Sequence, residues 1–301
     1  MQVAGFPRAL AALVFIGAAA PSEILLREQA WTSTGETLAR DMIVVPGECV
    51  ATRTVETEIG RALFRSPTLL GGPAARAGLS CNACHSNGRT NARFSLPELT
   101  NVPGHADVSS EWSSKVRGDG VMNPVLIPDL AGVGARETFG HLRDPSLDHF
   151  THSVVTEEFQ GAEPPAQATA GVIAYLRALD AGACSSERRI TLTSAADDVR
   201  RAITAAETAD APTARLLLLA AQDGMGRIAE RLPARRFGAD RSRFERLSRE
   251  LGRMRRDNVH ELLTDALPGW RARFDMAVTR VARRERQTYF NEATLRAALQ
   301  D

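Results

Sequence analysis

Two cysteines and a histidine are the residues of this chain whose types and spacing most clearly indicate chemistry. They form the run Cys81-Asn82-Ala83-Cys84-His85. Two thiols three positions apart on one helical turn can each add across a vinyl group of haem, and the imidazole that follows is then held where it can ligate the iron. The sequence therefore predicts one covalent haem c, with Cys81 and Cys84 as the attachment points and His85 as the proximal iron ligand.

Three other chemistries use the same spacing of cysteines. A zinc site of this type needs a second pair of Cys or His ligands, and the sequence contains none at ligand spacing. A C-x-x-C redox pair is expected in a βαβ context, which is also missing. A structural disulfide between Cys81 and Cys84 remains an alternative, and haem attachment is the favoured interpretation.

The other two cysteines, Cys49 and Cys184, are expected to be bonded to each other. In an oxidising compartment two leftover cysteines are more often bridged than free. Two unpaired buried thiols are the alternative. Because Cys49 and Cys184 flank one block of sequence, we expect residues 49–185 to form the haem domain.

The N-terminus is typical of an export signal. Arg8 precedes an apolar run of about a dozen residues, which is shorter than the roughly twenty that a membrane span needs. Gly17-Ala18-Ala19 is a small-x-small cleavage site. We therefore predict a signal peptide at residues 1–20 and export, with a buried N-terminal helix as the alternative. Export agrees with the haem motif, since c-type cytochromes of bacteria receive their haem outside the cytoplasm, so we expect the periplasm or another exported location in a bacterium. Residues 21–48 form an N-terminal segment with little periodicity.

Helices and one long irregular stretch surround the motif. Apolar periodicity predicts a helix from Glu56 to Ser66, another opened by Ser146 and a third opened by Pro165. Residues 86–140 are rich in Gly, Pro, Asn and Ser and predict loops. So long a loop needs something to organise it, and we expect the haem to act as its core.

Five short stretches between positions 55 and 181 have family-like patterns: Gly60-Arg61-Ala62-Leu63-Phe64, Leu79-Ser80-Cys81, Ile127-Pro128-Asp129-Leu130, Phe139-Gly140-His141 and Ala174-Tyr175-Leu176-Arg177. Together they resemble a haem domain of the bacterial di-haem cytochrome c peroxidases. The likeness covers residues 55–181, and it implies a cytochrome c-like fold. Two departures matter: Leu142-Arg143 stand where the family has Asp-Gly after its histidine, and this chain has one haem motif instead of two.

The sequence offers several candidates for the sixth ligand of the iron. His152 is the favoured distal candidate, because it borders the apolar face of the helix opened by Ser146. Met122 is the alternative, and a thioether there would raise the potential. His141 and His149 are weaker candidates, and His105 is expected to be a solvated loop residue.

Residues 186–301 predict an antiparallel bundle of four amphipathic helices, the last opened by Pro268. The charge balance is −6 over residues 21–185 and +6 over residues 186–301, while the whole chain carries +1. The net charge gives no reason to expect nucleic acid as a partner. The basic half is a candidate for peripheral contact with anionic lipid.

The chain is thus predicted to be all-α, a cytochrome c-like haem domain followed by a helical bundle. The favoured function is that of an exported mono-haem c-type cytochrome, which passes electrons to a redox protein partner by Fe(III)/Fe(II) cycling. The alternative is a peroxidase-like enzyme with an open distal site. Catalysis of that kind needs a nearby acid or base such as His141, His152 or Glu157.

Overall fold

The computed structural model describes residues 25–256 and 259–300, with the side chains of 259–264 left aside. The predicted signal peptide therefore lies outside the described residues. The described chain is mostly helical and contains no closed sheet, as the sequence predicts. None of the described helices is both long enough and apolar enough to cross a membrane.

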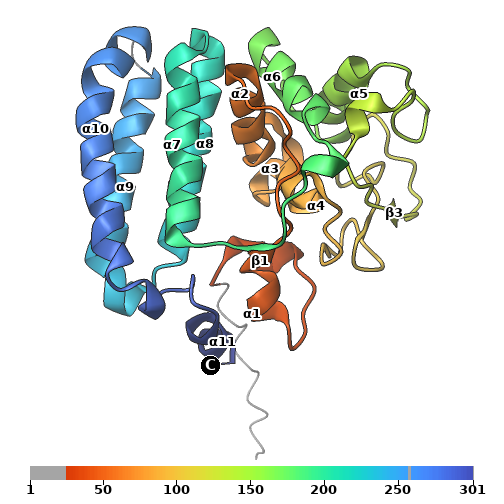
Figure 1. Cartoon of the computed structure of the whole chain (residues 1–301). Helices are drawn as coiled ribbons and strands as arrows, with labels where there is room; N and C mark the ends of the chain where they lie inside the picture. Colours follow the sequence, from red (N-terminus) through yellow and green to blue (C-terminus); the bar gives the residue numbers. More distant parts are fainter. Residues whose placement is uncertain (1–24, 257–258, 301) are drawn as a thin grey trace, which may run out of the picture.

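Four long helices form a bundle on one side of the molecule (Figure 1). They are α7 (Leu192–Thr208), α8 (Ala211–Glu230), α9 (Ala234–Arg256) and α10 (Val259–Ala282). Helix α7 packs against α8 and α10, and α9 packs against the same two helices. Because only two residues connect α7 to α8 and three connect α8 to α9, successive helices run antiparallel, as predicted.

Side chains cap the first two helices of the bundle. Thr191 Oγ1 accepts a hydrogen bond from Ser194 N (3.1 Å), and the Asp210 carboxylate accepts one from Thr213 N (2.8 Å).

Pro268 was expected to open the last helix, but it lies inside α10. Its ring is exposed, so water can replace the backbone hydrogen bond that proline cannot make.

Helices α2 (Val55–Phe64) and α6 (Ala166–Arg177) cross very closely beside the bundle (Figure 1). A Cβ atom on Gly60 would lie 1.9 Å from the backbone oxygen of Gly171, so only glycine fits at the crossing. Helix α2 also packs against α7 and α8, and one apolar cluster continues from α2 and α6 into the bundle. The two halves of the chain share this core, and the domain boundary at residue 185 stays a prediction.

Short elements complete the fold. Residues 25–48 lie below the bundle, where α1 packs against α11 (Figure 1). Residues 86–140 are largely irregular, as predicted. The remaining elements are η1 (Arg27–Trp31), α1 (Leu38–Asp41), η2 (Pro67–Leu69), α3 (Gly72–Arg76), α4 (Cys81–Cys84), η3 (Ser86–Gly88), η4 (Val133–Ala135), α5 (Leu147–Ser153), the π-helical turn η5 (Val154–Glu158), η6 (Ala181–Ala183), η7 (Glu285–Gln287) and α11 (Glu292–Gln300).

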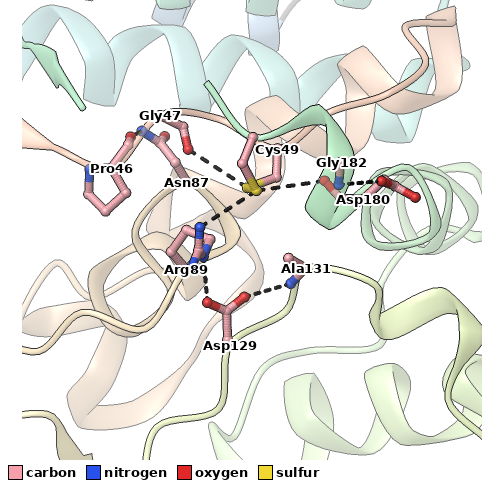
Figure 2. Close-up of a disulfide and its surroundings, with 10 residues drawn as sticks. Pro46, Gly47, Cys49, Asn87, Arg89, Asp129, Ala131, Asp180 and Gly182 are labelled. Carbon is pink, nitrogen blue, oxygen red and sulfur yellow. Dashed lines mark hydrogen bonds and ion pairs between the residues drawn. A yellow bond between two sulfur atoms is a disulfide. The ribbon is translucent and has the colours of Figure 1, made fainter. Parts of the chain in front are cut away.

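A disulfide and a strand pair bring the two ends of residues 49–185 together. Cys49 and Cys184 are bonded, which confirms the predicted disulfide (Figure 2). Close to them, β1 (Val44–Val45) pairs antiparallel with β4 (Arg188–Arg189). A second antiparallel pair, β2 (His105–Ala106) with β3 (Val125–Leu126), lies within the irregular region.

Candidate functional site

The C-x-x-C-H motif occupies a single helical turn, α4, which His85 ends. His85 N donates to the backbone oxygen of Cys81 (2.8 Å). Residues three apart on a helix share a face, so Cys81 and Cys84 lie on the same side of the turn. Both thiols are free and half-buried. A disulfide within the motif, one of the alternatives for this spacing, is therefore not formed.

One hydrogen bond sets the orientation and the tautomer of His85. Its Nδ1 lies 3.0 Å from the backbone oxygen of Pro128. A carbonyl oxygen only accepts, so Nδ1 carries the proton and Nε2 keeps its lone pair. This is the form in which imidazole ligates a metal. Burial lowers the pKa of His85 to about 4, so the ring is neutral at neutral pH.

Hydrogen bonds on both sides of Pro128 hold its carbonyl group beside the motif. Leu130 N donates to the backbone oxygen of Gly88 (2.9 Å), and Thr90 Oγ1 donates to that of Ile127 (2.9 Å). The loop that follows the motif is thus joined to residues 127–130, and Pro128 lies between the two links. This long-range junction is what positions the acceptor for His85.

The disulfide lies next to the same junction. Arg89 donates to the Asp129 carboxylate, and its Nη1 lies 3.6 Å from Cys184 Sγ (Figure 2). Asp129 in turn accepts a hydrogen bond from Ala131 N (2.8 Å). Arg89 therefore contacts both the disulfide and Asp129, the residue that follows Pro128.

Burial keeps both thiols of the motif protonated. It raises the pKa of Cys81 to about 11. The pKa of Cys84 is also raised, first by burial and then by the neighbouring Cys81. Redox-active C-x-x-C pairs instead have a thiol whose pKa is lowered by nearby positive charge or a helix N-terminus. The surroundings of this motif do not resemble those of such a pair.

The motif turn packs on a buried apolar cluster, and the segment that supplies Pro128 carries much exposed apolar surface. Ala83 belongs to a buried cluster with Leu79, Phe94 and Ile127. Seven of the nine large apolar side chains that are exposed in the described part of the chain fall between positions 102 and 142. Isolated exposed apolar residues are ordinary, but a concentration in one segment indicates a ligand or partner. The seven are Val102, Val116, Val121, Met122, Val125, Leu126 and Leu142.

The candidates for a distal ligand have different surroundings. His152 lies on α5, and its Nε2 is 2.8 Å from a carboxylate oxygen of Glu163. Met122 is 51% exposed in the loop before β3. His149 Nδ1 contacts the Asp144 carboxylate. To bind iron through Nε2, His152 would have to give up its contact with Glu163.

His141 and His105 lie in the irregular region. His141 is exposed in the turn after Phe139. His105 is half-buried in β2, so the prediction of a solvated loop residue is only partly right.

A buried carboxyl group that sequence reasoning missed lies at the end of the π-helical turn. Glu158 is 7% exposed, and burial raises its pKa to about 6 even though Arg117 Nη1 lies 2.6 Å away. Its neighbour Glu157 was one of the residues expected to serve as an acid or base, with His141 and His152, and it is more exposed than Glu158. Adjacent carboxylates at 157 and 158 were visible in the sequence, but only packing decides which one is buried.

The described residues offer no shared metal site of the zinc type. Within residues 25–256 and 259–300, no three or more His, Cys, Asp or Glu side chains are grouped to hold a metal ion. No family model, curated protein or solved structure matches this chain. The functional assignment therefore depends on the geometry of the motif and its surroundings.

Proposed function

We propose that this protein is an exported mono-haem c-type cytochrome that transfers electrons. The observation that carries the proposal is the hydrogen bond from His85 Nδ1 to the Pro128 oxygen, beside two free thiols on one turn. A c-type haem requires two thiols on one face and an imidazole whose Nε2 is available. The motif turn meets these requirements, with Cys81 and Cys84 as the attachment points.

The segment between positions 102 and 142 supports the same proposal. It supplies Pro128 and also carries seven exposed apolar side chains, which a flat apolar macrocycle would cover. Residues 49–185 would then form a cytochrome c-like domain around the haem. When bound, the haem supplies one-electron chemistry by cycling between Fe(III) and Fe(II). The contribution of the chain is to keep the imidazole of His85 neutral and oriented.

Two features are consistent with an exported protein. The Cys49–Cys184 disulfide is typical of an oxidising compartment such as the periplasm. An electron carrier also requires a redox protein partner, whose identity the sequence does not specify.

A peroxidase-like enzyme is the second candidate, and Glu158 favours it. A buried carboxyl whose pKa is about 6 suits a general acid or base near neutral pH. Its neighbour Phe159 packs against the apolar cluster that contains Ala83 of the motif. In this case the distal side of the iron would stay open instead of being closed by His152 or Met122.

Haem attachment is tested by exporting the full chain from a bacterium that matures c-type cytochromes. We expect the mass of the purified protein to include one macrocycle that survives denaturation. Cys81→Ala with Cys84→Ala should abolish this addition. The matched control, Cys49→Ser with Cys184→Ser, also removes two cysteines and should retain it. A wild-type mass without the macrocycle would refute the proposal.

Optical spectra of the same protein distinguish the two functions. Low-spin iron in both oxidation states supports the electron carrier, and high-spin iron with peroxide turnover supports the enzyme. We expect His152→Ala to convert a low-spin form to high-spin. His149→Ala changes an exposed histidine on the same helix and should have no effect. If Met122→Ala alone produces the change, Met122 is the ligand.

A further inference from the structure

A small cavity lies where the two halves of the chain meet, and neither thiol of the motif lines it. Its volume is about 120 Å³. Its walls come from α2, from the turn that follows the motif, from β4 and from α7 and α8. Five of the lining residues are arginines: Arg61, Arg65, Arg188, Arg227 and Arg231. Only three lining residues are carboxylates, namely Glu28, Asp198 and Asp223.

The three carboxylates are already engaged. Asp198 pairs with Arg61 (2.7 Å) and Arg65 (3.5 Å). Asp223 pairs with Arg227 (2.9 Å), and it also pairs with Arg27, which lies outside the cavity. Glu28 pairs with Arg231 (2.7 Å). Glu48, which lies outside the lining, also pairs with Arg61 and Arg65, so Arg188 is the lining arginine that has no carboxylate partner among the described residues.

Three single nitrogen atoms of the arginines that line this cavity lack a hydrogen-bond acceptor. The Nε atoms of Arg65 and Arg188 and the Nη2 atom of Arg227 are buried and have no hydrogen-bond partner among the described residues. A buried N–H group without an acceptor costs about 1–3 kcal/mol. Three such groups in one small cavity indicate that an acceptor belongs there.

Arg188 shows the imbalance most clearly. Its side chain makes no hydrogen bond or ion pair with any residue that the structure describes. Burial lowers the pKa of Arg188, and the positive charges of Arg65 and Arg61 lower it further, although Asp198 partly opposes them. An arginine held between other arginines with no acid of its own is the arrangement of an anion site.

We propose that this cavity binds one small inorganic oxyanion of the phosphate or sulfate type. Guanidinium groups donate paired N–H groups to such oxygens, and a tetrahedral anion can accept from several directions at once. Pockets for drug-sized ligands are roughly 300–1,000 Å³, so this cavity is too small for a nucleotide or a lipid headgroup. Asn82, inside the motif, and Asn87 also line it, which puts the anion behind the motif turn.

The site joins segments that are far apart in sequence. Arg65 is the C-cap residue of α2, Arg188 belongs to β4 and Arg227 to α8, so a bound oxyanion would connect the N-terminal half to the bundle. The cavity arginines are not part of the C-x-x-C-H motif. Anion binding and haem attachment can therefore fail independently in an experiment.

Calorimetric titration of the full-length purified protein with sodium phosphate tests the proposal. We expect saturable binding at one site. Arg188→Gln should weaken the affinity at least tenfold. The control Arg189→Gln removes the next arginine, which is half-exposed and paired with Glu292, and should leave the affinity unchanged. Equal affinities for wild type and both variants, or binding of chloride as strongly as phosphate, would overturn the proposal.

Thermal unfolding gives a second readout that separates loss of binding from loss of folding. In phosphate-free buffer Arg188→Gln should unfold at the same temperature as wild type or higher, because it removes an unpaired, half-buried charge. In phosphate the wild type should gain stability by mass action and the variant should not. A variant that unfolds earlier than wild type by the same margin in both buffers would contradict the inference.

Discussion

Replacing Glu48 with glutamine removes a carboxylate that three arginines share. Glu48 lies 2.6 Å from Arg61, 2.9 Å from Arg53 and 3.5 Å from Arg65. The side chains of Glu48 and Arg61 are only 8% and 3% exposed. The change therefore leaves a buried guanidinium group with less compensating charge, in a region that water reaches poorly.

The expected loss follows from this burial. Removing one partner of a buried ion pair costs about 3–5 kcal/mol. We expect the lower end, about 3 kcal/mol, because Arg61 keeps Asp198 at 2.7 Å and the glutamine oxygen still accepts a hydrogen bond. Glu292→Gln is the matched control, since Glu292 pairs with Arg189 and Arg296 near the surface. Exposed pairs of this kind contribute little, so the control should unfold as wild type does.

The assay is urea unfolding followed by circular dichroism, at pH 7 and at decreasing pH. Burial alone would raise the pKa of Glu48, but Arg65, Arg61 and Arg53 outweigh it and hold this pKa far below its ordinary value. The stabilisation is then complete above pH 4.5 and is lost as the pH falls through the lowered pKa. A loss at pH 7 below about 1 kcal/mol, equal to that of the control, would refute the reasoning.

Three further predictions concern the disulfide, a helix crossing and a buried acid. Cys49→Ser with Cys184→Ser opens a link between residues 135 apart, and urea unfolding should show a loss of up to about 5 kcal/mol in the chain-entropy model. Gly60→Ala should destabilise by about 1–3 kcal/mol because its Cβ meets a backbone oxygen of α6, whereas Gly238→Ala, with open space around its Cβ, should not destabilise. Glu158 has a raised pKa of about 6, so it makes the protein less stable as the pH rises from 4.5 to 6, by about 2 kcal/mol. In Glu158→Gln this part of the pH dependence should disappear, and an unchanged slope would show that another group causes it.

Features that depend on neighbouring residues could be predicted from the sequence. Apolar periodicity and capping residues located α2, α5 and α6 and the bundle helices, because helix formation depends on spacings of three and four residues. Counting cysteines was sufficient to pair Cys49 with Cys184, since the motif accounts for the other two. The placement of Pro268 failed, because a proline at the start of a helix and one on an exposed face inside it have the same local pattern.

The amino-acid sequence by itself determined the motif, the helical class and the disulfide partners. Tertiary structure alone decided three features. The Pro128 carbonyl accepts a hydrogen bond from His85, Glu48 pairs with three arginines, and Arg188 has no carboxylate partner among the described residues. The physical reason is that a hydrogen bond or an ion pair between distant segments depends on how whole helices pack. No spacing within a short window of sequence records that packing.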